Sequence, residues 1–170
     1  MKTKTLATVA LLVALSFIGA HITVFGTIAF DSLPGFLAAL LLGPVYGAAI
    51  GFLGHILTAT LRGYPLSVPL HIVIAFTMAL AMYVFGISYK VLRKKLSEAV
   101  TLTVTGIVGM IFNVPVSLAF SIATLWFMAG REAALGLLAL LPFLAAASLA
   151  NIVLAIALFK ALRNVWNKNT

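Results

Sequence analysis

The chain contains 170 residues, of which 64% are hydrophobic and only 8% are charged, and its mean hydropathy is +1.22. About a quarter of the residues in soluble domains are charged, so this composition excludes a soluble enzyme or binding domain and indicates an integral membrane protein. The net charge of +8 is therefore expected to report on membrane orientation and not on binding of nucleic acid. Because the chain has no cysteine, disulfides and thiolate metal sites are excluded.

Six apolar segments follow one another along the chain. We expect an all-α integral membrane protein, one domain over residues 1–170, with six transmembrane helices at about 6–20, 33–42, 46–61, 70–89, 100–126 and 142–159. A short apolar segment at 133–141 precedes the last of them. The first segment is expected to be retained and not cleaved as a signal peptide, since no polar cleavage region follows it.

The stretch from Asp31 to Arg62 could form one tilted span or two short ones. Gly43-Pro44 near its middle favours a break, because proline removes a backbone donor and clashes with the preceding turn. Two spans here place both termini and the 90–95 cluster on the same side of the membrane. That side then holds nine of the 11 basic residues: Lys2, Lys4, Lys90, Arg93, Lys94, Lys95, Lys160, Arg163 and Lys168. Since cytoplasmic loops are rich in Lys and Arg, we expect two short spans and both termini in the cytoplasm.

Small residues lie along one face of the third segment, namely Gly43, Gly47, Ala48, Gly51 and Gly54. Helices in lipid approach one another closely at such residues, so this face is expected to pack inside the protein. The first segment carries a second stripe, formed by Ala7, Ala10 and Ala14 at helical spacing. This stripe could pack internally or could meet a helix of another protein.

The sequence contains no phosphate-binding loop, HExxH or GxSxG motif, so we do not expect an enzyme, and no cofactor is implied. All three acidic residues, Asp31, Glu98 and Glu132, fall at predicted span ends. An ion-coupled carrier usually needs an ionisable group within the membrane, and no carboxylate lies there. Any energy from ATP must come from a partner.

Neutral polar residues remain inside the predicted spans. His55 and His71 lie near the outer ends of the third and fourth spans, Asn113 about midway along the fifth, and Asn151 within the sixth. Polar groups at such depth are either satisfied between helices or offered to a ligand. We expect a ligand site formed by these four residues. His21, in the outer loop, is a weaker candidate.

Other residues near the outer boundary have simpler explanations. Asp31 is expected to cap the helix that begins at Leu33, with ligand contact as the alternative. Arg62 is expected to be a solvated charge that could also hold the outer loops. The aromatic residues there are expected to anchor the interface, and one or two of them could stack on a flat ligand. They are Phe25, Phe30, Tyr64 and Trp126; we include Tyr64 among the predicted binding residues.

Several motifs in order resemble one family. They are a basic N-terminus, a first span with AxxxA, Asp31-x-x-Pro34 opening a span, Leu41-Leu42-Gly43-Pro44-x-x-Gly47 as a turn, and Leu141-Pro142-Phe143 followed by Asn151. In this order they are similar to the substrate-binding S component of energy-coupling factor (ECF) vitamin transporters, and the resemblance covers essentially the whole chain.

The resemblance implies a prokaryotic plasma-membrane protein that binds a micronutrient at its outer face. It would associate with a transmembrane coupling protein (the T component) and two cytoplasmic ATPases, and topple in the membrane to release the solute. The family's AxxxA implies that Ala7, Ala10 and Ala14 form the surface that docks on the T component.

Overall similarity makes α-ribazole, used in cobamide salvage, the first expectation for the substrate. Pantothenate, thiamine precursors, niacin and pyridoxine are alternatives. Three histidines on the outer side could also suggest a metal site. The nickel and cobalt S components, however, begin Met-His, whereas this chain begins Met-Lys, so no metal site is expected. A self-sufficient small-solute permease and a structural subunit of a membrane complex are the alternatives from other classes.

Overall fold

The computed structural model describes residues 3–21, 23–24, 28–29 and 31–168. The helices are α1 (Thr3–Gly19), α2 (Leu33–Leu41), α3 (Pro44–Leu61), α4 (Val68–Leu92), α5 (Glu98–Ile111), α6 (Ser117–Ala129), α7 (Arg131–Gly136) and α8 (Leu141–Lys168). A π-helical segment, η1 (Phe112–Val116), joins α5 to α6, and a 3₁₀ segment, η2 (Leu137–Leu140), joins α7 to α8. Within the described residues the helices therefore form six helical units, as the sequence predicts. Strands β1 (Thr23–Val24) and β2 (Ile28–Ala29) pair antiparallel between α1 and α2.

Four helical runs in the described part of the chain are long and apolar enough to cross a membrane. They are Pro44–Leu61, Val68–Leu92, Glu98–Ala129 and Arg131–Trp166. α1 is a shorter apolar helix of 17 residues. α2 has only nine residues, a rise of about 13 Å, which is less than half the thickness of a bilayer core. The second predicted span is thus a half-length helix.

The hairpin of α2 and α3 breaks at the Gly43-Pro44 pair. Gly43 has a φ of +112°, which glycine adopts without the steric cost that other residues would meet. Pro44 then occupies the first turn of α3, where a missing backbone N–H costs nothing. The break that the sequence predicts is therefore present, and the two helices pack directly against each other.

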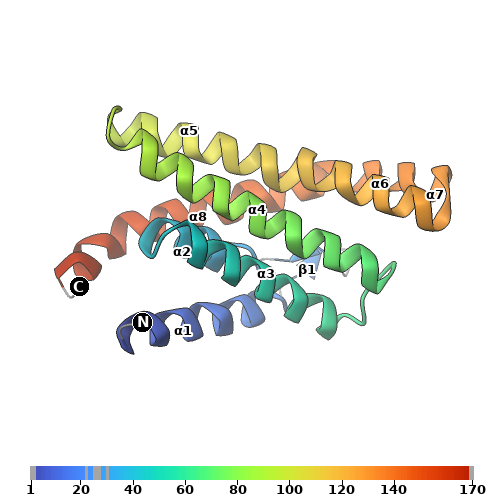
Figure 1. The fold of residues 1–170 in the computed structure, drawn as a ribbon, viewed down its shortest axis with the longest axis horizontal. Helices are drawn as coiled ribbons and strands as arrows, with labels where there is room; N and C mark the ends of the chain where they lie inside the picture. Colours follow the sequence, from blue (N-terminus) through green and yellow to red (C-terminus); the bar gives the residue numbers. More distant parts are fainter. Residues whose placement is uncertain (1–2, 22, 25–27, 30, 169–170) are drawn as a thin grey trace.

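The connections between helices gather at two opposite ends of the molecule. Figure 1 shows both termini and the turn between α4 and α5 at one end, with the α3–α4 and α6–α7 connections at the other. We call these the inner end and the outer end. The basic residues from Lys90 to Lys95 thus lie at the same end as both termini, which is the arrangement that the charge pattern predicts.

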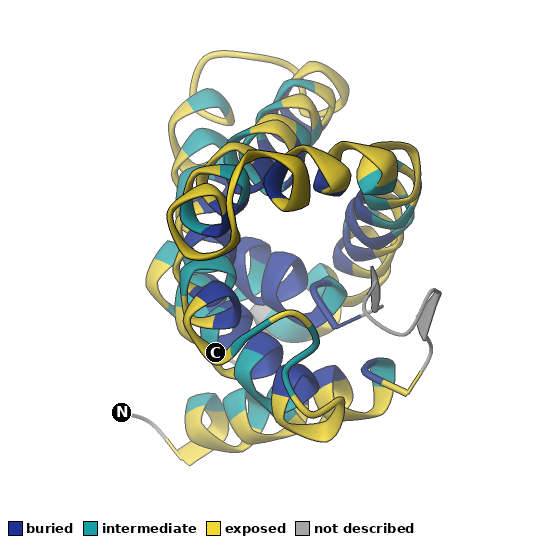
Figure 2. Cartoon of the chain, turned by 90° about the vertical axis from the view of Figure 1, so that its right-hand side faces the viewer, coloured by how far each residue is buried: buried dark blue, intermediate teal, exposed yellow. Residues whose placement is uncertain are grey.

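The glycines of α3 allow three other helices to pack closely against it. A Cβ at Gly47 would meet Ala39 of α2, one at Gly51 would meet Met82 of α4, and one at Gly54 would meet Ser16 of α1. Three different helices therefore approach α3 at positions without side chains. Figure 2 shows the buried positions of the helices turned toward their neighbours and the exposed positions turned outward, as expected in lipid.

Two other prolines, Pro115 and Pro142, lie within helical structure and do not interrupt it. Pro115 lies inside η1, where the wider π turn accommodates the missing donor and lets α5 continue into α6. Pro142 is the second residue of α8, a first-turn position where proline fits. α8 thus begins one residue before the predicted start at Pro142, and α7 and η2 add helical structure from Arg131 onward.

Candidate functional site

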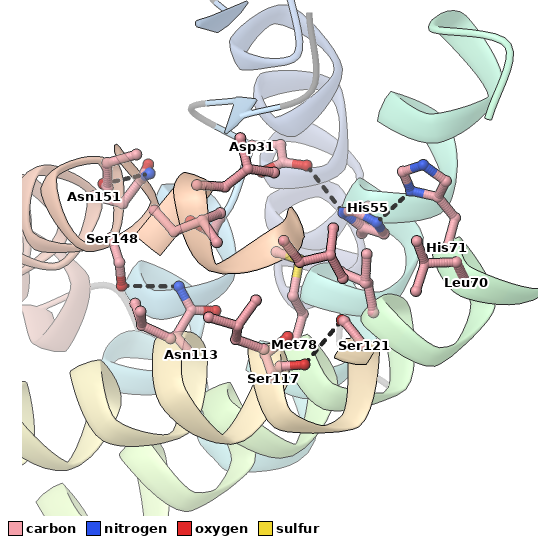
Figure 3. A pocket seen from close by; sticks show the side chains of 18 of the residues that line it. Asp31, His55, Leu70, His71, Met78, Asn113, Ser117, Ser121, Ser148 and Asn151 are labelled. Atoms are coloured by element: carbon pink, nitrogen blue, oxygen red, sulfur yellow. Dashed lines mark hydrogen bonds and ion pairs between the residues drawn. The ribbon is translucent and has the colours of Figure 1, made fainter. Parts of the chain in front are cut away.

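A cavity of about 130 Å³ lies toward the outer end, between α3, α4, α6, η2 and α8 (Figure 3). Its wall is largely apolar, with side chains such as Leu70, Ile74, Met78 and Leu144. The polar lining residues come from every side of the cavity: Asp31, Ser32, His55, His71, Asn113, Ser117, Ser121, Ser148 and Asn151. Leu66, 62% exposed, also lines it, so the cavity reaches the surface of the molecule.

The structure brings four of the five predicted binding residues to this cavity. His55, His71, Asn113 and Asn151 all line it, although they are separated by up to 96 positions in the sequence. Tyr64 does not belong to the lining. Its ring packs edge to face on His71 with ring centres 5.9 Å apart, and its hydroxyl shares a hydrogen bond of 2.8 Å with Thr60.

The two asparagines have different partners. Asn113 is half-buried and donates from Nδ2 to Oγ of Ser148 across the cavity wall, at 2.8 Å. Asn151 is 1% exposed, accepts from the backbone N–H of Leu33 at 3.1 Å, and donates to the carbonyl of Ala147. Leu33 is the first residue of α2, whose amide has no partner within its own helix. Asn151 therefore caps α2 from α8.

Two histidine rings form a chain at the other side of the cavity. His55 Nε2 lies 3.1 Å from His71 Nδ1, and His71 Nε2 lies 2.7 Å from the carbonyl oxygen of Pro65. Tyr64 and Leu66, on either side of Pro65, have φ angles of +52° and +76°, which side chains rarely adopt. His71 thus holds a strained connection between α3 and α4 in place.

The predicted role of Asp31 as the helix cap is wrong. Ser32 occupies the N-cap position of α2, and the carboxylate of Asp31 instead faces Nδ1 of His55, with Oδ2 3.6 Å away. Burial raises the pKa of the Asp31 carboxyl. Hydrogen bonding to His55 and the charge of that ring lower it by a larger amount, so the pKa lies below its usual value. Asp31 is 5% exposed, and its pairing with an imidazole explains how it is tolerated there.

The described residues contain no group of three or more His, Cys, Asp or Glu side chains that could hold a metal ion. His55 and His71 are neighbours, but their facing nitrogens are bonded to each other. The third histidine, His21, lies outside the cavity lining, and its Nδ1 contacts the carbonyl of Phe17 at 3.0 Å.

Sequence reasoning missed four serines that line the cavity, Ser32, Ser117, Ser121 and Ser148. Ser117 and Ser121 follow Asn113 at intervals of four residues, so a polar stripe along one helix face was present in the sequence. Ser148 precedes Asn151 by one helical turn. Ser117 also reaches Thr77 of α4 at 2.7 Å, which joins the stripe to a second helix.

The remaining predicted residues lie at the periphery. Arg62 is exposed but donates from Nη2 to the carbonyls of Ala20 and His21, at 3.0 and 3.4 Å, so it ties the end of α3 to the end of α1. Trp126 is 48% exposed on the outside of α6. Phe25 and Phe30 lie outside the described residues.

The alanine stripe of α1 faces away from the protein. Ala7, Ala10 and Ala14 are all exposed, whereas Leu12 and Ser16 on the other side of the helix are buried. Packing of the stripe inside this chain, one of the two predicted possibilities, is therefore not what the structure has. The stripe is an open surface of small side chains.

Comparison with known proteins gives one match. The sequence matches the family described as the ECF transporter substrate-specific component over residues 4–163. No curated protein and no solved structure matches the chain. The matched range contains α1 except its first residue, every helix from α2 to α7, most of α8, and all the residues that line the cavity.

Proposed function

Since the chain belongs to the family of ECF transporter substrate-specific components, we propose that it captures a vitamin or vitamin precursor in the cavity at its outer end. Members of this family are subunits of plasma-membrane transporters and not enzymes. They work with a T component and ATPases in one membrane complex. The observation that carries the proposal is the cavity toward the outer end. Its wall is largely apolar, and amide, hydroxyl and imidazole groups also line it.

The proposal requires the outer end to face outward and the inner end to face the cytoplasm of a prokaryotic cell. The gathering of both termini and the Lys90–Lys95 cluster at one end supports this orientation. Single cysteines can test it, because the chain has none of its own. We expect an impermeant thiol reagent added to intact cells to label Ser67→Cys and Gly130→Cys, and not Ser97→Cys. The reverse labelling pattern would contradict the orientation.

For the substrate, we propose α-ribazole. Its flat benzimidazole suits the apolar wall, and its sugar hydroxyls suit the amide of Asn113 and the hydroxyl of Ser148. No Lys or Arg lines the cavity among the described residues, which favours a neutral solute over a phosphorylated one. Pantothenate, thiamine precursors, niacin and pyridoxine are the alternatives within the same function.

The direct test is to identify the solute that the protein carries. The protein would be purified from cells grown in rich medium, denatured, and its bound small molecules identified by mass spectrometry. We expect one species in a stoichiometric amount, and α-ribazole as that species. Another vitamin would change the substrate and keep the function. If no small molecule co-purifies and none of the named vitamins stabilises the protein, the proposed function is wrong.

We further propose that Ala7, Ala10 and Ala14 dock on the T component. Their exposure supports this role, since small side chains let a second helix approach closely. We expect Ala10→Trp or Ala14→Trp to leave solute affinity within about threefold and to abolish ATP-driven uptake in proteoliposomes that contain the full complex. The matched control is Leu12→Trp, on the buried side of the same helix, which should damage folding and binding together. Normal uptake by both alanine variants would falsify the docking surface.

A further inference from the structure

We infer that Asp31 determines the specificity of the cavity, by requiring a solute that donates a hydrogen bond to its carboxylate and carries no anionic group. The inference rests on the proposed function of solute binding and narrows the class of substrate. It follows from tracing the hydrogen bonds of the histidines, and then those of Ser117, Ser121, Asn113 and Ser148 on the other side of the cavity.

Both ring nitrogens of His71 are engaged by other parts of the protein. The carbonyl oxygen of Pro65 can only accept, so His71 Nε2, 2.7 Å away, must carry a hydrogen. In a neutral ring the other nitrogen, Nδ1, is then an acceptor. It accepts from Nε2 of His55 at 3.1 Å. His71 therefore has no ring nitrogen left for a solute.

The arrangement of hydrogens on His71 determines that on His55, which in turn contacts Asp31. Since His55 Nε2 donates to His71, a neutral His55 would turn a bare Nδ1 lone pair toward the carboxylate of Asp31, and two acceptors would face each other at 3.6 Å. A hydrogen on Nδ1 removes this conflict and makes His55 an imidazolium paired with an ionised Asp31. Its Nε2 hydrogen is then bonded to His71, and its Nδ1 hydrogen faces the carboxylate of Asp31.

Few titratable groups surround the linked side chains of Asp31, His55 and His71. Asp31, at the start of the α2 segment, faces His55 of α3, and His55 faces His71 of α4. The connection between α3 and α4 contributes the ring of Tyr64 against His71. No Lys, Arg or Glu lines the cavity among the described residues. The positive charge of His55 is consequently directed at Asp31 and is not available to an anionic solute.

The other side of the cavity adds neutral groups. Thr77 donates to the carbonyl of Ile74, so the hydrogen between Thr77 and Ser117 comes from Ser117, and Ser121 donates to the carbonyl of Ser117. Both serines therefore keep only lone pairs. Asn113 keeps its carbonyl oxygen, and Ser148, which accepts from Asn113, keeps its hydrogen.

Only Asp31 has both a fixed hydrogen-bonding role and a full charge open to the solute. A carboxylate offers about four acceptor sites on two oxygens, and His55 faces only one of these oxygens, Oδ2, at 3.6 Å. A hydroxyl, amine or ring N–H placed there gains a charge-assisted hydrogen bond. A carboxylate or phosphate would meet repulsion and would find no free cation in the described lining.

Matched pairs of probes test the class of solute. Binding to the purified protein would be measured by calorimetry for α-ribazole and its 5′-phosphate, pyridoxine and 4-pyridoxate, and panthenol and pantothenate. In any pair that binds, we expect the uncharged member to bind at least tenfold more tightly. An anionic member that binds as tightly as its partner would overturn the inference.

A second measurement needs no solute and tests the proton arrangement directly. The chain has three histidines, so ¹⁵N-histidine spectra in nanodiscs can be assigned with single His→Asn variants. Near neutral pH we expect both nitrogens of His55 to be protonated, only Nε2 of His71 to be protonated, and a scalar coupling across the bond between the rings. A neutral His55, or a hydrogen on His71 Nδ1, would overturn the inference even if a probe binds. If no probe binds and the expected spectrum is found, the proposed function fails and the proton arrangement stands.

One variant links the two measurements. Asp31→Asn removes the carboxylate and keeps the size of the side chain, so we expect at least a tenfold loss of affinity for the uncharged probe and loss of the Nδ1 hydrogen of His55. His21→Asn is the matched control, because His21 is exposed and lies outside the lining; it should change neither. Unchanged affinity in Asp31→Asn, with the protein folded, would contradict the role of Asp31.

Discussion

The inner and outer halves of this protein use the same helices in opposite ways. In the middle and inner part of α4, Met82 and Phe85 are fully buried, and Met82 packs against two glycines of neighbouring helices. In its outer part, His71 and Ile74 line a cavity. Helices in lipid come together where side chains are small. The cavity lies between the outer parts of these helices, where histidines, branched side chains and a π-helical segment line it.

The largest effect should come from filling a glycine contact of the inner half. Gly86→Leu would place a side chain against the backbone of Pro44, the first residue of α3, so α4 could accommodate it only by separating from α3. We expect no folded monomer in detergent, as measured by size-exclusion chromatography and thermal unfolding.

Gly136→Leu is the matched control for that change. Gly136 is also helical, but nothing lies within 4 Å of the position that its Cβ would take. This variant should fold and bind like the original protein. If Gly86→Leu also folds normally, the close packing of α3 against α4 does not hold the inner half together.

An intermediate effect should separate the two asparagines of the outer half. Asn113→Ala removes a half-buried amide that lines the cavity, which should weaken solute binding by about ten- to a hundredfold with little change in stability. Asn151→Ala leaves the amide of the half-buried Leu33 without its side-chain partner, so it should lower the free energy of unfolding by about 1–3 kcal/mol and weaken binding as well. Calorimetry and thermal unfolding of both variants measure the difference. Equal losses of stability would contradict the division of roles.

The smallest effect belongs to the ion pair at the inner end. Arg163 of α8 and Glu98 of α5 lie 2.8 Å apart, with side chains 32% and 44% exposed. Exposed pairs contribute only about 0.2–1 kcal/mol, so Glu98→Gln should lower the unfolding temperature by no more than a few degrees and leave binding unchanged. A loss of stability as large as that of Asn151→Ala would show that the inner end depends on charge more than on packing.

The sequence predicted the architecture well because membrane helices leave strong local signals. Hydropathy marked the helical units, and Gly43-Pro44 marked the break between α2 and α3. The spacing of small residues marked the packing face of α3. Hydropathy did not show that the short apolar segment before Pro142 is itself helical, as α7 and the 3₁₀ turn η2.

The candidate site was less predictable because its geometry depends on pairs far apart in the chain. Depth in the membrane was enough to nominate His55, His71, Asn113 and Asn151, but it could not tell that Asn151 caps α2. It also could not tell that Asp31 turns away from its own helix toward His55. No local pattern encodes such contacts, since each of them depends on how two helices cross.

The position of Met82 makes its sulfur a reporter of motion. Met82 is fully buried, and its Sδ lies against the backbone of both Gly35 and Gly51. An added sulfoxide oxygen would have no room there, and peroxide could reach the sulfur only after α2, α3 and α4 had separated. Methionine oxidation requires such access. The rate of oxidation of Met82, relative to that of the exposed Met128, would therefore measure how often the inner half of the protein opens.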